Sequence, residues 1–353
     1  MMVTTPPKIL QPDPSILIIL MGSLGDLIRG LCLVAHIKNN LPNSRVTWLV
    51  ETAWAQIVSF QPQIDKMIVF NRPKNVFALR ELYQNLSQQN FDITLDLQRH
   101  FKSGFFSLLS GAKRRIGFHR KNAKEFNWFF NNEHIENISD ELSLPKWRHY
   151  LKFTEYLGLP EPSSLDFGFS SLDVKTVAQG IVTEINNPFI AVVIGTSWKT
   201  KEWFFQGYYE LIDNILSSGN NKVVLLGDRS KTTYAASLCE KVDSPRLINI
   251  VGKTSLLELA AILKDATAGV GPDSGPAHLA AAVGTPFVTL FGPTPSKRMA
   301  PYKCEHLVVK TDISCAPCYK KKCPELDRRC MRLISAEAVM GKLTEALAMD
   351  RMD

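Results

Sequence analysis

The feature that most constrains the fold is an alternation of short apolar runs with segments of helical periodicity, which occurs twice along the chain. In the first half, the apolar runs span residues 16–20, 46–50, 66–70, 92–97 and 114–119. Between the first two lies "LIRGLCLVAHIKNNLP", whose apolar residues recur at helical spacing. Continuous apolar strands joined by helices predict a parallel sheet that is covered on both faces.

The second half repeats this alternation, with apolar runs at 189–195, 222–227, 247–252, 267–271 and 287–292. The segment 156–188 between the halves is rich in turn formers, which indicates a linker. The predicted fold class is therefore α/β, with two Rossmann-like doubly wound domains. The predicted boundaries are a flexible N-terminal tail at 1–14, a first domain at 15–165, a second domain at 185–332 and a C-terminal helix at 335–353.

Composition and charge narrow the class of protein. The apolar runs are shorter than the ~18 residues of a membrane helix, and the N-terminus lacks the basic and apolar regions of a signal peptide. We therefore expect a cytoplasmic protein. The formal net charge of +7 indicates an anionic partner. Because no nucleic-acid-binding module accompanies the basic residues, a phosphorylated or membrane-surface substrate is favoured over nucleic acid.

The stretch "GVGPDSGPAHLAAAVGTP", which begins at residue 269, places a helix start directly after a strand. Asp273 or Ser274 can cap this helix, and Gly275 lets a phosphate approach the backbone closely. The N–H groups of the first turn suit a pyrophosphate, and His278 lies close enough to donate to it. The alternative is a capped structural helix with a partly buried histidine.

A second turn of interest is "MGSLGDLIRG", residues 21–30, which also joins a strand to a helix. It carries a carboxylate, Asp26, where the helix begins. Its spacing is G-x-x-G-D, with Gly22 and Gly25, whereas dinucleotide-binding enzymes have G-x-G-x-x-G. The turn therefore argues against a dinucleotide-dependent oxidoreductase, which is kept as an alternative function.

Four stretches together carry a resemblance to a known family. "D-S-G-x-x-H-L-A-A-A-x-G-T-P", followed by "L-F-G-P-T", resembles the C-terminal signature of glycosyltransferase family 9, the ADP-heptose:lipopolysaccharide heptosyltransferases. "GSLGDLIRG", "DLQRHFKSG" (96–104) and "GTSWKTKEW" (195–203) are similar to three further segments of that family, in the same order. Where the family usually has Asp-Thr-Gly, this chain has Ser274, which keeps the hydroxyl.

The resemblance implies a GT-B fold, in which two Rossmann-like domains face each other across a cleft. It implies an inverting transfer without a metal or other cofactor, from an ADP-heptose donor bound by the second domain. By resemblance, Asp26 is the base that deprotonates the acceptor, and Lys201 is the cation that stabilises the leaving diphosphate. The other donor-binding candidates are Thr196, Ser197, Asp228, Thr254, Asp273, Ser274, Gly275 and His278.

The acceptor that the resemblance implies is the anionic inner core of lipopolysaccharide, which carries Kdo and heptose. Arg and Lys suit its carboxylates and phosphates, and the candidate acceptor-binding residues are Gly25, Gln98, Arg99, Lys102 and Arg120. Aromatic residues at 101, 105, 106 and 128–130 could contact the inner membrane surface on its cytoplasmic face. Core packing is nevertheless more usual for such residues, and we expect it for most of them.

Cys315, Cys318, Cys323 and Cys330 form a C-x2-C-x4-C-x6-C group, which invites a zinc interpretation. The spacing is shorter than that of two-pair zinc ribbons. A similar pattern occurs in heptosyltransferases of the second-heptose type, so the group supports the resemblance, and we predict no metal site.

Two further alternatives are another nucleotide-sugar-dependent GT-B glycosyltransferase and a non-catalytic glycolipid-binding module. The binding module would not need a carboxylate at position 26.

Overall fold

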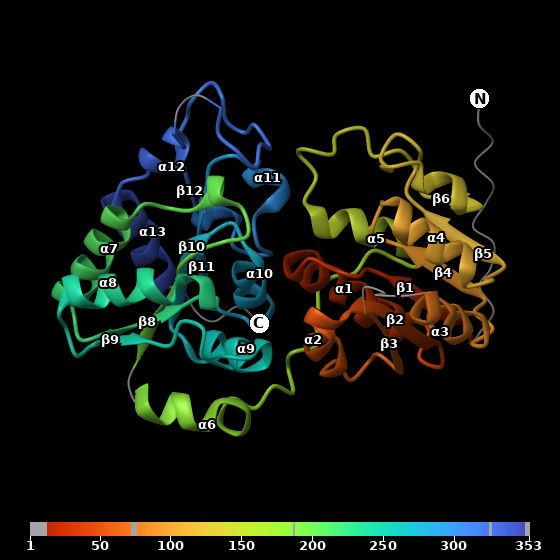
Figure 1. Ribbon diagram of the computed structural model, residues 1–353, viewed down its shortest axis with the longest axis horizontal. Coiled ribbons are helices and arrows are strands. Elements are labelled where there is room, and N and C mark those ends of the chain that lie inside the picture. Colours follow the sequence, from red (N-terminus) through yellow and green to blue (C-terminus); the bar gives the residue numbers. More distant parts are fainter. Residues whose placement is uncertain (1–12, 72–75, 186–187, 325–326, 350–353) are drawn as a thin grey trace. The chain divides into compact units, whose positions relative to one another are not determined.

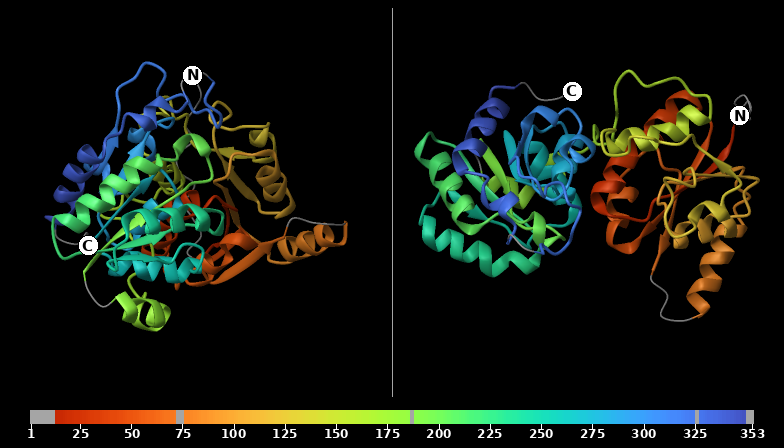
Figure 2. Two further views of the ribbon diagram at one scale, coloured as in Figure 1. Left: turned by 60° about the vertical axis from the view of Figure 1, so that its left-hand side comes forward. Right: turned by 90° about the horizontal axis from the view of Figure 1, so that it is seen from above.

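The computed structural model describes residues 13–71, 76–185, 188–324 and 327–349, so the predicted N-terminal tail lies almost entirely outside the described residues. The chain divides into two compact units, Met1–Phe169 and Ser170–Asp353. Each unit contains one six-stranded parallel sheet with helices on both of its faces (Figures 1 and 2). In Figure 1 the first unit runs from red to yellow-green and the second from green to blue.

The sheet of the first unit has the order β3-β2-β1-β4-β5-β6. Its strands are β1 (Ser15–Ile19), β2 (Arg45–Glu51), β3 (Lys66–Phe70), β4 (Ile93–Asp96), β5 (Arg114–Gly117) and β6 (Glu133–His134). The helices are α1 (Leu24–Asn40), η1 (Thr52–Trp54), α2 (Ala55–Ser59), α3 (Val76–Ser87), α4 (Phe101–Leu109), η2 (Asn127–Phe130) and α5 (Lys146–Tyr156). The strands predicted in this half are confirmed as β1 to β5.

The sheet of the second unit has the order β12-β11-β10-β7-β8-β9. Its strands are β7 (Phe189–Val193), β8 (Lys222–Leu226), β9 (Leu247–Asn249), β10 (Ala268–Pro272), β11 (Phe287–Phe291) and β12 (Val308–Lys310). The helices are α6 (Val174–Ile185), η3 (Lys199–Lys201), α7 (Phe205–Ser217), η4 (Arg229–Lys231), α8 (Thr232–Val242), α9 (Leu256–Asp265), α10 (Gly275–Ala282), α11 (Ser296–Met299), η5 (Glu305–Leu307), α12 (Arg329–Arg332) and α13 (Ala336–Leu347). Strands β7 to β11 confirm the five predicted strands.

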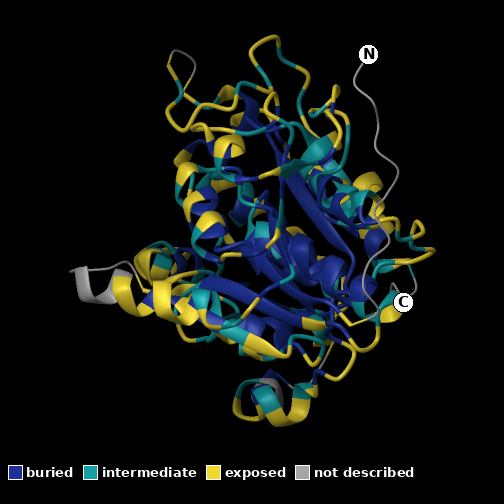
Figure 3. Ribbon diagram, turned by 90° about the vertical axis from the view of Figure 1, so that its right-hand side faces the viewer, coloured by how far each residue is buried: buried dark blue, intermediate teal, exposed yellow. Residues whose placement is uncertain are grey.

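Burial explains why the apolar runs become strands. Every residue of β1 is buried, because a parallel strand in the middle of such a sheet is covered from both faces. Trp48 of β2 is also fully buried, and its Nε1–H donates to the carbonyl of Leu20 at 2.9 Å. Figure 3 shows the strands in the dark blue of buried residues, with exposed residues gathered on the outer helices and loops.

The segment 156–188 contains more regular structure than its composition indicates. Helix α6 lies within it and packs against α9 of the second unit. Helix α13, at the other end of this unit, packs against α7. Helix α13 also contacts β10 and β11, so it forms part of the cover of the second sheet.

Both sheets share one topology, in which the second and third strands extend the sheet on one side of the first strand and the next three extend it on the other side. The direction of extension reverses between β1 and β4 in the first unit, and between β7 and β10 in the second. Loops that leave such neighbouring strands diverge at their carboxyl ends, which is where doubly wound sheets bind ligands. No helix among the described residues has both the length and the apolar character to span a membrane.

Candidate functional site

The turn after β1 is shaped by a close approach between backbone and side chain. Gly22 has a φ of +156°, and a Cβ at this position would lie 2.5 Å from Nε1 of Trp54, so only glycine fits. Gln98, which follows β4, donates from Nε2 to the carbonyl of Gly22 at 2.7 Å. Its Oε1 accepts the N–H of Met21, also at 2.7 Å. Gln98 therefore holds this turn in place from the neighbouring strand.

Asp26 lies in the first turn of α1, and its side chain is one-fifth exposed. Its Oδ1 accepts hydrogen bonds from Arg29 at 2.7 Å, from Lys146, and from the hydroxyl of Tyr150 at 3.3 Å. Burial by itself would raise the pKa of Asp26, but the cations of Lys146 and Arg29 outweigh it and hold the pKa well below its usual range. The carboxylate is therefore ionised at neutral pH, as a general base must be.

The partners of Asp26 are mostly not evident from the sequence. Arg29 could have been found, because residues three apart on a helix are neighbours. Lys146 and Tyr150 lie on α5, which packs against α1, and Lys146 is 120 residues away in the chain. No sequence signal connects residues at that separation.

The candidate acceptor-binding residues differ in how they are placed. Arg99 is buried, and its NH1 donates to both carboxylate oxygens of Glu141, at 2.9 and 3.1 Å. Lys102 pairs with Glu51 at 2.7 Å. Arg120 is exposed and forms no ion pair among the described residues. Arg99 and Gln98 thus carry structural bonds in addition to any role toward an acceptor, which stays a prediction.

In the second unit, the loop after β7 leads to Lys201, whose Nζ lies 2.7 Å from Oδ2 of Asp273. The same oxygen accepts a hydrogen bond from Oγ1 of Thr294 at 2.7 Å. Lys201 is 9% exposed and Asp273 is 3% exposed, so this is a buried ion pair. Asp273 therefore orients Lys201 through its side chain.

The position of Lys201 is fixed by Trp203, two residues further on. The Trp203 ring is buried against Tyr208, with ring centroids 5.0 Å apart, and its Nε1–H donates to the carbonyl of Ile334 at 3.1 Å. The ring also packs closely against Gly207, where a Cβ would lie 2.5 Å from it. These contacts fix the indole and, with it, the segment that carries Lys201.

Helix α10 begins directly after β10, with Ser274 as its N-cap residue. The predicted cap is wrong in one respect, because Ser274 makes no side-chain cap bond and Asp273 bonds to Lys201 and Thr294 instead. Oγ of Ser274 is buried and has no hydrogen-bond partner among the described residues. His278 is buried near the helix start. The hydroxyl and the free N–H groups of this helix start are therefore available to an anion.

The remaining donor-binding candidates lie in loops after strands of the second sheet. Thr196 and Ser197 follow β7, and Thr254 immediately precedes the N-cap of α9. Asp228 follows β8 and is exposed, and its Oδ1 accepts the N–H of Ser230 at 2.7 Å. Asp228 thus caps the short helix η4, and its role toward a ribose stays a prediction.

The four-cysteine group contains no disulfide. Burial is the main cause that raises the pKa of the Cys330 thiol, and Cys315, Cys318 and Cys323 add a smaller electrostatic contribution. In the part of the chain that the structure describes, no three His, Cys, Asp or Glu side chains are arranged to hold a metal ion.

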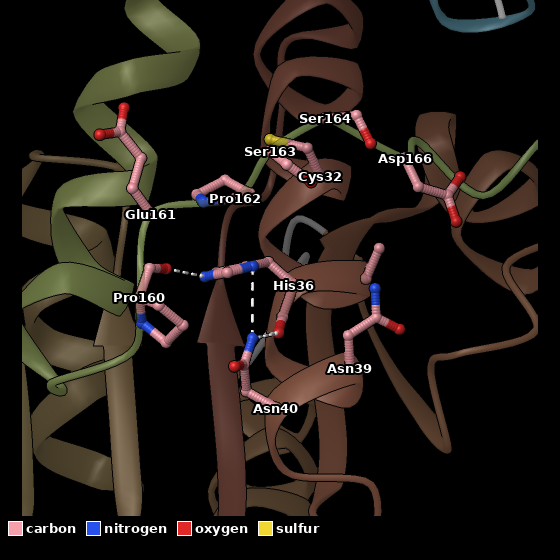
Figure 4. A pocket seen from close by; sticks show the side chains of 11 residues that line it. Cys32, His36, Asn39, Asn40, Pro160, Glu161, Pro162, Ser163, Ser164 and Asp166 are labelled. Carbon is pink, nitrogen blue, oxygen red and sulfur yellow. Dashed lines mark hydrogen bonds between the residues drawn. The ribbon is translucent and has the colours of Figure 1, made fainter.

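A cavity of about 280 Å³ lies in the first unit, between α1 and the segment 160–166. Figure 4 shows His36 bonded to the carbonyl of Pro160, at 2.8 Å, with Asn40 against the other side of the imidazole. The cavity lining includes none of the predicted site residues. Its side chains tie the end of the first unit to α1.

Comparison with known proteins places the chain in a family. The model of glycosyltransferase family 9 (heptosyltransferase) matches residues 79–328. The lipopolysaccharide core heptosyltransferase OpsX of Haemophilus influenzae is 29% identical over 302 residues, which cover 84% of each chain. Lipopolysaccharide heptosyltransferase 1 of Pseudomonas aeruginosa is 26% identical over 320 residues, which cover 87% of each chain.

Solved structures agree on the fold. The glycosyl transferase family 9 protein of Veillonella parvula has a TM-score of 0.80 at 20% identity, and the match covers 96% of this chain and 99% of that one. ADP-heptose lps heptosyltransferase II of E. coli has a TM-score of 0.75 at 19% identity and covers 94% and 98%. The predicted α/β fold class, of the GT-B type, is confirmed, and the oxidoreductase alternative is excluded. The chain belongs to glycosyltransferase family 9 and is an enzyme of the heptosyltransferase family.

Proposed function

We propose that the protein transfers heptose from ADP-heptose to the inner core of lipopolysaccharide, by an inverting reaction that needs no metal ion or other cofactor. The observation that supports the proposal most strongly is that the two sheets present groups of opposite charge, a carboxylate in the first unit and a cation in the second. The first presents an ionised carboxylate, Asp26, at its topological switch point. The second presents a lysine and an uncapped helix start at the corresponding point.

The names of similar proteins support the donor and the acceptor. OpsX of Haemophilus influenzae is described as a lipopolysaccharide core heptosyltransferase. The E. coli heptosyltransferase WaaC, which shares the fold, has been solved with ADP and with ADP-2-deoxy-2-fluoro heptose. We propose that this chain uses the same classes of substrate, at the cytoplasmic face of the inner membrane.

In the proposed reaction, an acceptor hydroxyl attacks the anomeric carbon of the heptose. The bond from the acceptor oxygen to that carbon forms while the bond to the β-phosphate oxygen breaks, and the electron pair of the broken bond leaves with ADP. Asp26 takes the proton of the hydroxyl. A positioned base of this kind contributes roughly 10²- to 10⁴-fold to a rate.

The departing diphosphate gains negative charge, which needs preorganised donors. Lys201 supplies a cation, and α10 supplies N–H groups together with the unpartnered Oγ of Ser274. Asp273 keeps the lysine in place, so the site does not depend on ordering a flexible side chain when the donor binds. These residues offer the charge compensation for which other glycosyltransferases use a divalent metal.

We propose the second-heptose acceptor, on the basis of the four-cysteine pattern at 315–330. Similar proteins carry the names of both types, heptosyltransferase 1 and heptosyltransferase 2. The test offers ADP-heptose to the purified protein with Kdo-lipid A that either lacks or carries a first heptose, and measures ADP release. Release with the heptose-bearing acceptor alone is the expected result, and release with neither would overturn the proposed function.

Asp26→Asn separates the enzyme from a binding module. The variant should bind the acceptor with unchanged affinity while ADP release falls by at least about 100-fold, because the amide cannot take the proton. Unchanged turnover would remove Asp26 from the reaction.

We also propose that the enzyme contacts the membrane through an aromatic face of the first unit, formed by Phe101, Phe105, Phe126, Trp128 and Phe129. The expectation that most of the aromatics at 101, 105, 106 and 128–130 lie in the core is wrong, because four of these six are exposed and only Phe106 is buried. Phe126, which the sequence did not single out, is 75% exposed and adds to this face. An exposed aromatic cluster of this kind marks an interaction surface.

The charge around this face favours an anionic bilayer. Residues 100–130 contain seven Lys or Arg and a single acidic residue, Glu125. Among the described residues, four of these cations are exposed and form no ion pair, and they are Lys113, Arg120, Lys121 and Lys124. Exposed aromatics with surrounding cations suit insertion at a headgroup boundary.

The test of this face is co-sedimentation with vesicles of phosphatidylethanolamine and phosphatidylglycerol. The double variant Phe126→Ser and Phe129→Ser should lose most of the binding, and vesicles of phosphatidylcholine alone should bind little wild-type protein. Tyr83→Ser is the matched control, because Tyr83 is an exposed aromatic of α3 in the same unit. Equal binding by all three proteins would overturn the membrane contact.

A further inference from the structure

The two oxygens of the Asp26 carboxylate differ in their surroundings. Oδ1 is contacted by three donors, from Arg29 at 2.7 Å, from Lys146, and from Tyr150 at 3.3 Å. Among the described residues, Oδ2 has only a 3.4 Å contact from the hydroxyl of Ser23, which is long for a hydrogen bond between two oxygens. The Asp26 side chain is one-fifth exposed, and Oδ2 is the oxygen that faces the exposed residue Ser23.

The donors on Oδ1 come from two packed helices. Arg29 belongs to α1, the helix of Asp26 itself, while Lys146 and Tyr150 stand one turn apart on α5. Arg99, from the loop after β4, is the other charge near Tyr150. The packing of α1 on α5 therefore fixes the rotation of the carboxylate about its own axis.

We propose that Lys146 and Tyr150 are positioning residues, which together with Arg29 hold Oδ1 and leave Oδ2 as the oxygen that takes the acceptor's proton. The inference rests on the proposed function, in which Asp26 is the general base. In the transfer, the O–H bond of the acceptor breaks toward Oδ2 as the acceptor oxygen bonds to the anomeric carbon. Oδ1 stays with its three donors throughout, so the carboxylate does not rotate between turnovers.

Lys146 has a second effect, because its positive charge favours the ionised form of Asp26. Removing that charge should raise the pKa of the base. Activity would then fall as the pH is lowered through a range in which the wild-type enzyme is still fully active. A purely structural lysine would not produce this change in the pH profile.

The experiment compares Lys146→Met, Lys146→Arg and Tyr150→Phe with the wild type, by following ADP release between pH 5 and pH 9. For Lys146→Met we expect kcat to fall roughly 10- to 100-fold with a smaller change in KM, and the acidic limb of kcat to move to higher pH. Lys146→Arg should restore the wild-type limb. Tyr150→Phe should lower kcat less and leave the limb close to that of the wild type, because it removes a neutral donor.

Lys152→Met is the matched control, since Lys152 lies on the same helix and pairs with Glu155 at the surface. It should keep the wild-type rate and pH profile. If Asp26→Asn is inactive while Lys146→Met keeps the wild-type profile, the positioning role is wrong and the proposed function stands. If Asp26→Asn is fully active, the base assignment fails first. Should Lys146→Met not fold, a Lys146→Gln variant carries the same comparison, and its unchanged profile would equally overturn the inference.

Discussion

The buried pair of Lys201 and Asp273 gives the sharpest prediction about the second unit. In Lys201→Met the methionine keeps most of the apolar stem, so the packing changes little. The carboxylate of Asp273, which is 3% exposed, then keeps the hydroxyl of Thr294 at 2.7 Å but loses its cation. The substitution therefore isolates the effect of the charge.

The expected loss of stability follows from that burial. Removing one partner of a buried ion pair costs about 3–5 kcal/mol, because the other charge remains desolvated. For a unit of this size, each kcal/mol lowers Tm by about 2–4 °C, so the transition of the second unit should fall by roughly 6–20 °C. Activity should fall by roughly 10²- to 10³-fold, since one preorganised donor to the leaving group is lost.

The assay is thermal and guanidinium unfolding of four proteins: the wild type, Lys201→Met, Asp273→Asn, and the double variant. The double variant has no buried charge, and its amide can still accept from Thr294. It should therefore be more stable than Lys201→Met, although equally inactive. Lys199→Met, an exposed lysine of the same short helix, should match the wild type within about 0.5 kcal/mol.

Two results would refute this reasoning. One is a loss below about 1 kcal/mol in Lys201→Met, which is the range of surface ion pairs. The other is a double variant whose loss equals the sum of the single losses within about 0.5 kcal/mol, which would mean that the two side chains do not interact.

Three further predictions concern single residues. Gly22→Ala should destabilise the first unit and lower activity, because the added Cβ would lie 2.5 Å from the Trp54 indole and clash with it. An unchanged melting temperature would contradict this packing. The pKa of Asp26 is lower in the folded than in the unfolded chain, so its ionised form stabilises the fold above about pH 4, and this stabilisation is lost as the pH falls further. Thermal melts at pH 7, 4 and 3 should therefore show a larger decrease in Tm on acidification for the wild type than for Asp26→Asn. Ser274→Ala should leave the melting temperature of the free enzyme unchanged, since the buried Oγ lacks a hydrogen-bond partner among the described residues. It should weaken ADP binding, measured by calorimetry, by about 2- to 10-fold. An unchanged ADP affinity would mean that the hydroxyl does not contact the donor.

Much of the fold could be predicted from the sequence, because the strands at the centre of each sheet are continuous apolar runs. Strands β6 and β12 and helices α5 and α6 are among the elements that escaped prediction. Strand β6 has two residues and β12 has three, which is too few to show any periodicity. Helix α6 was hidden within a segment whose turn-forming residues indicated a linker.

The candidate site divides in the same way. Asp26, Ser274 and Lys201 could be proposed from the sequence, because each lies in a short stretch that resembles a segment of glycosyltransferase family 9. The bonds of Gln98 and Arg99 could not, since both residues carry the polar groups of a ligand site yet use them on the protein itself. Neither could the pairing of Asp26 with Lys146.

The sequence by itself determined which residues stand at the carboxyl ends of the strands, because apolar patterning and glycine spacing are local properties of the chain. The tertiary structure decided their chemical state. The low pKa of Asp26 depends on Lys146 of α5, which lies 120 residues away, in addition to its helix neighbour Arg29. The orientation of Lys201 depends on a carboxylate that follows a different strand. Electrostatic interactions depend on distance in space, and only the packing of helices and strands brings such remote charges within a few ångströms of each other.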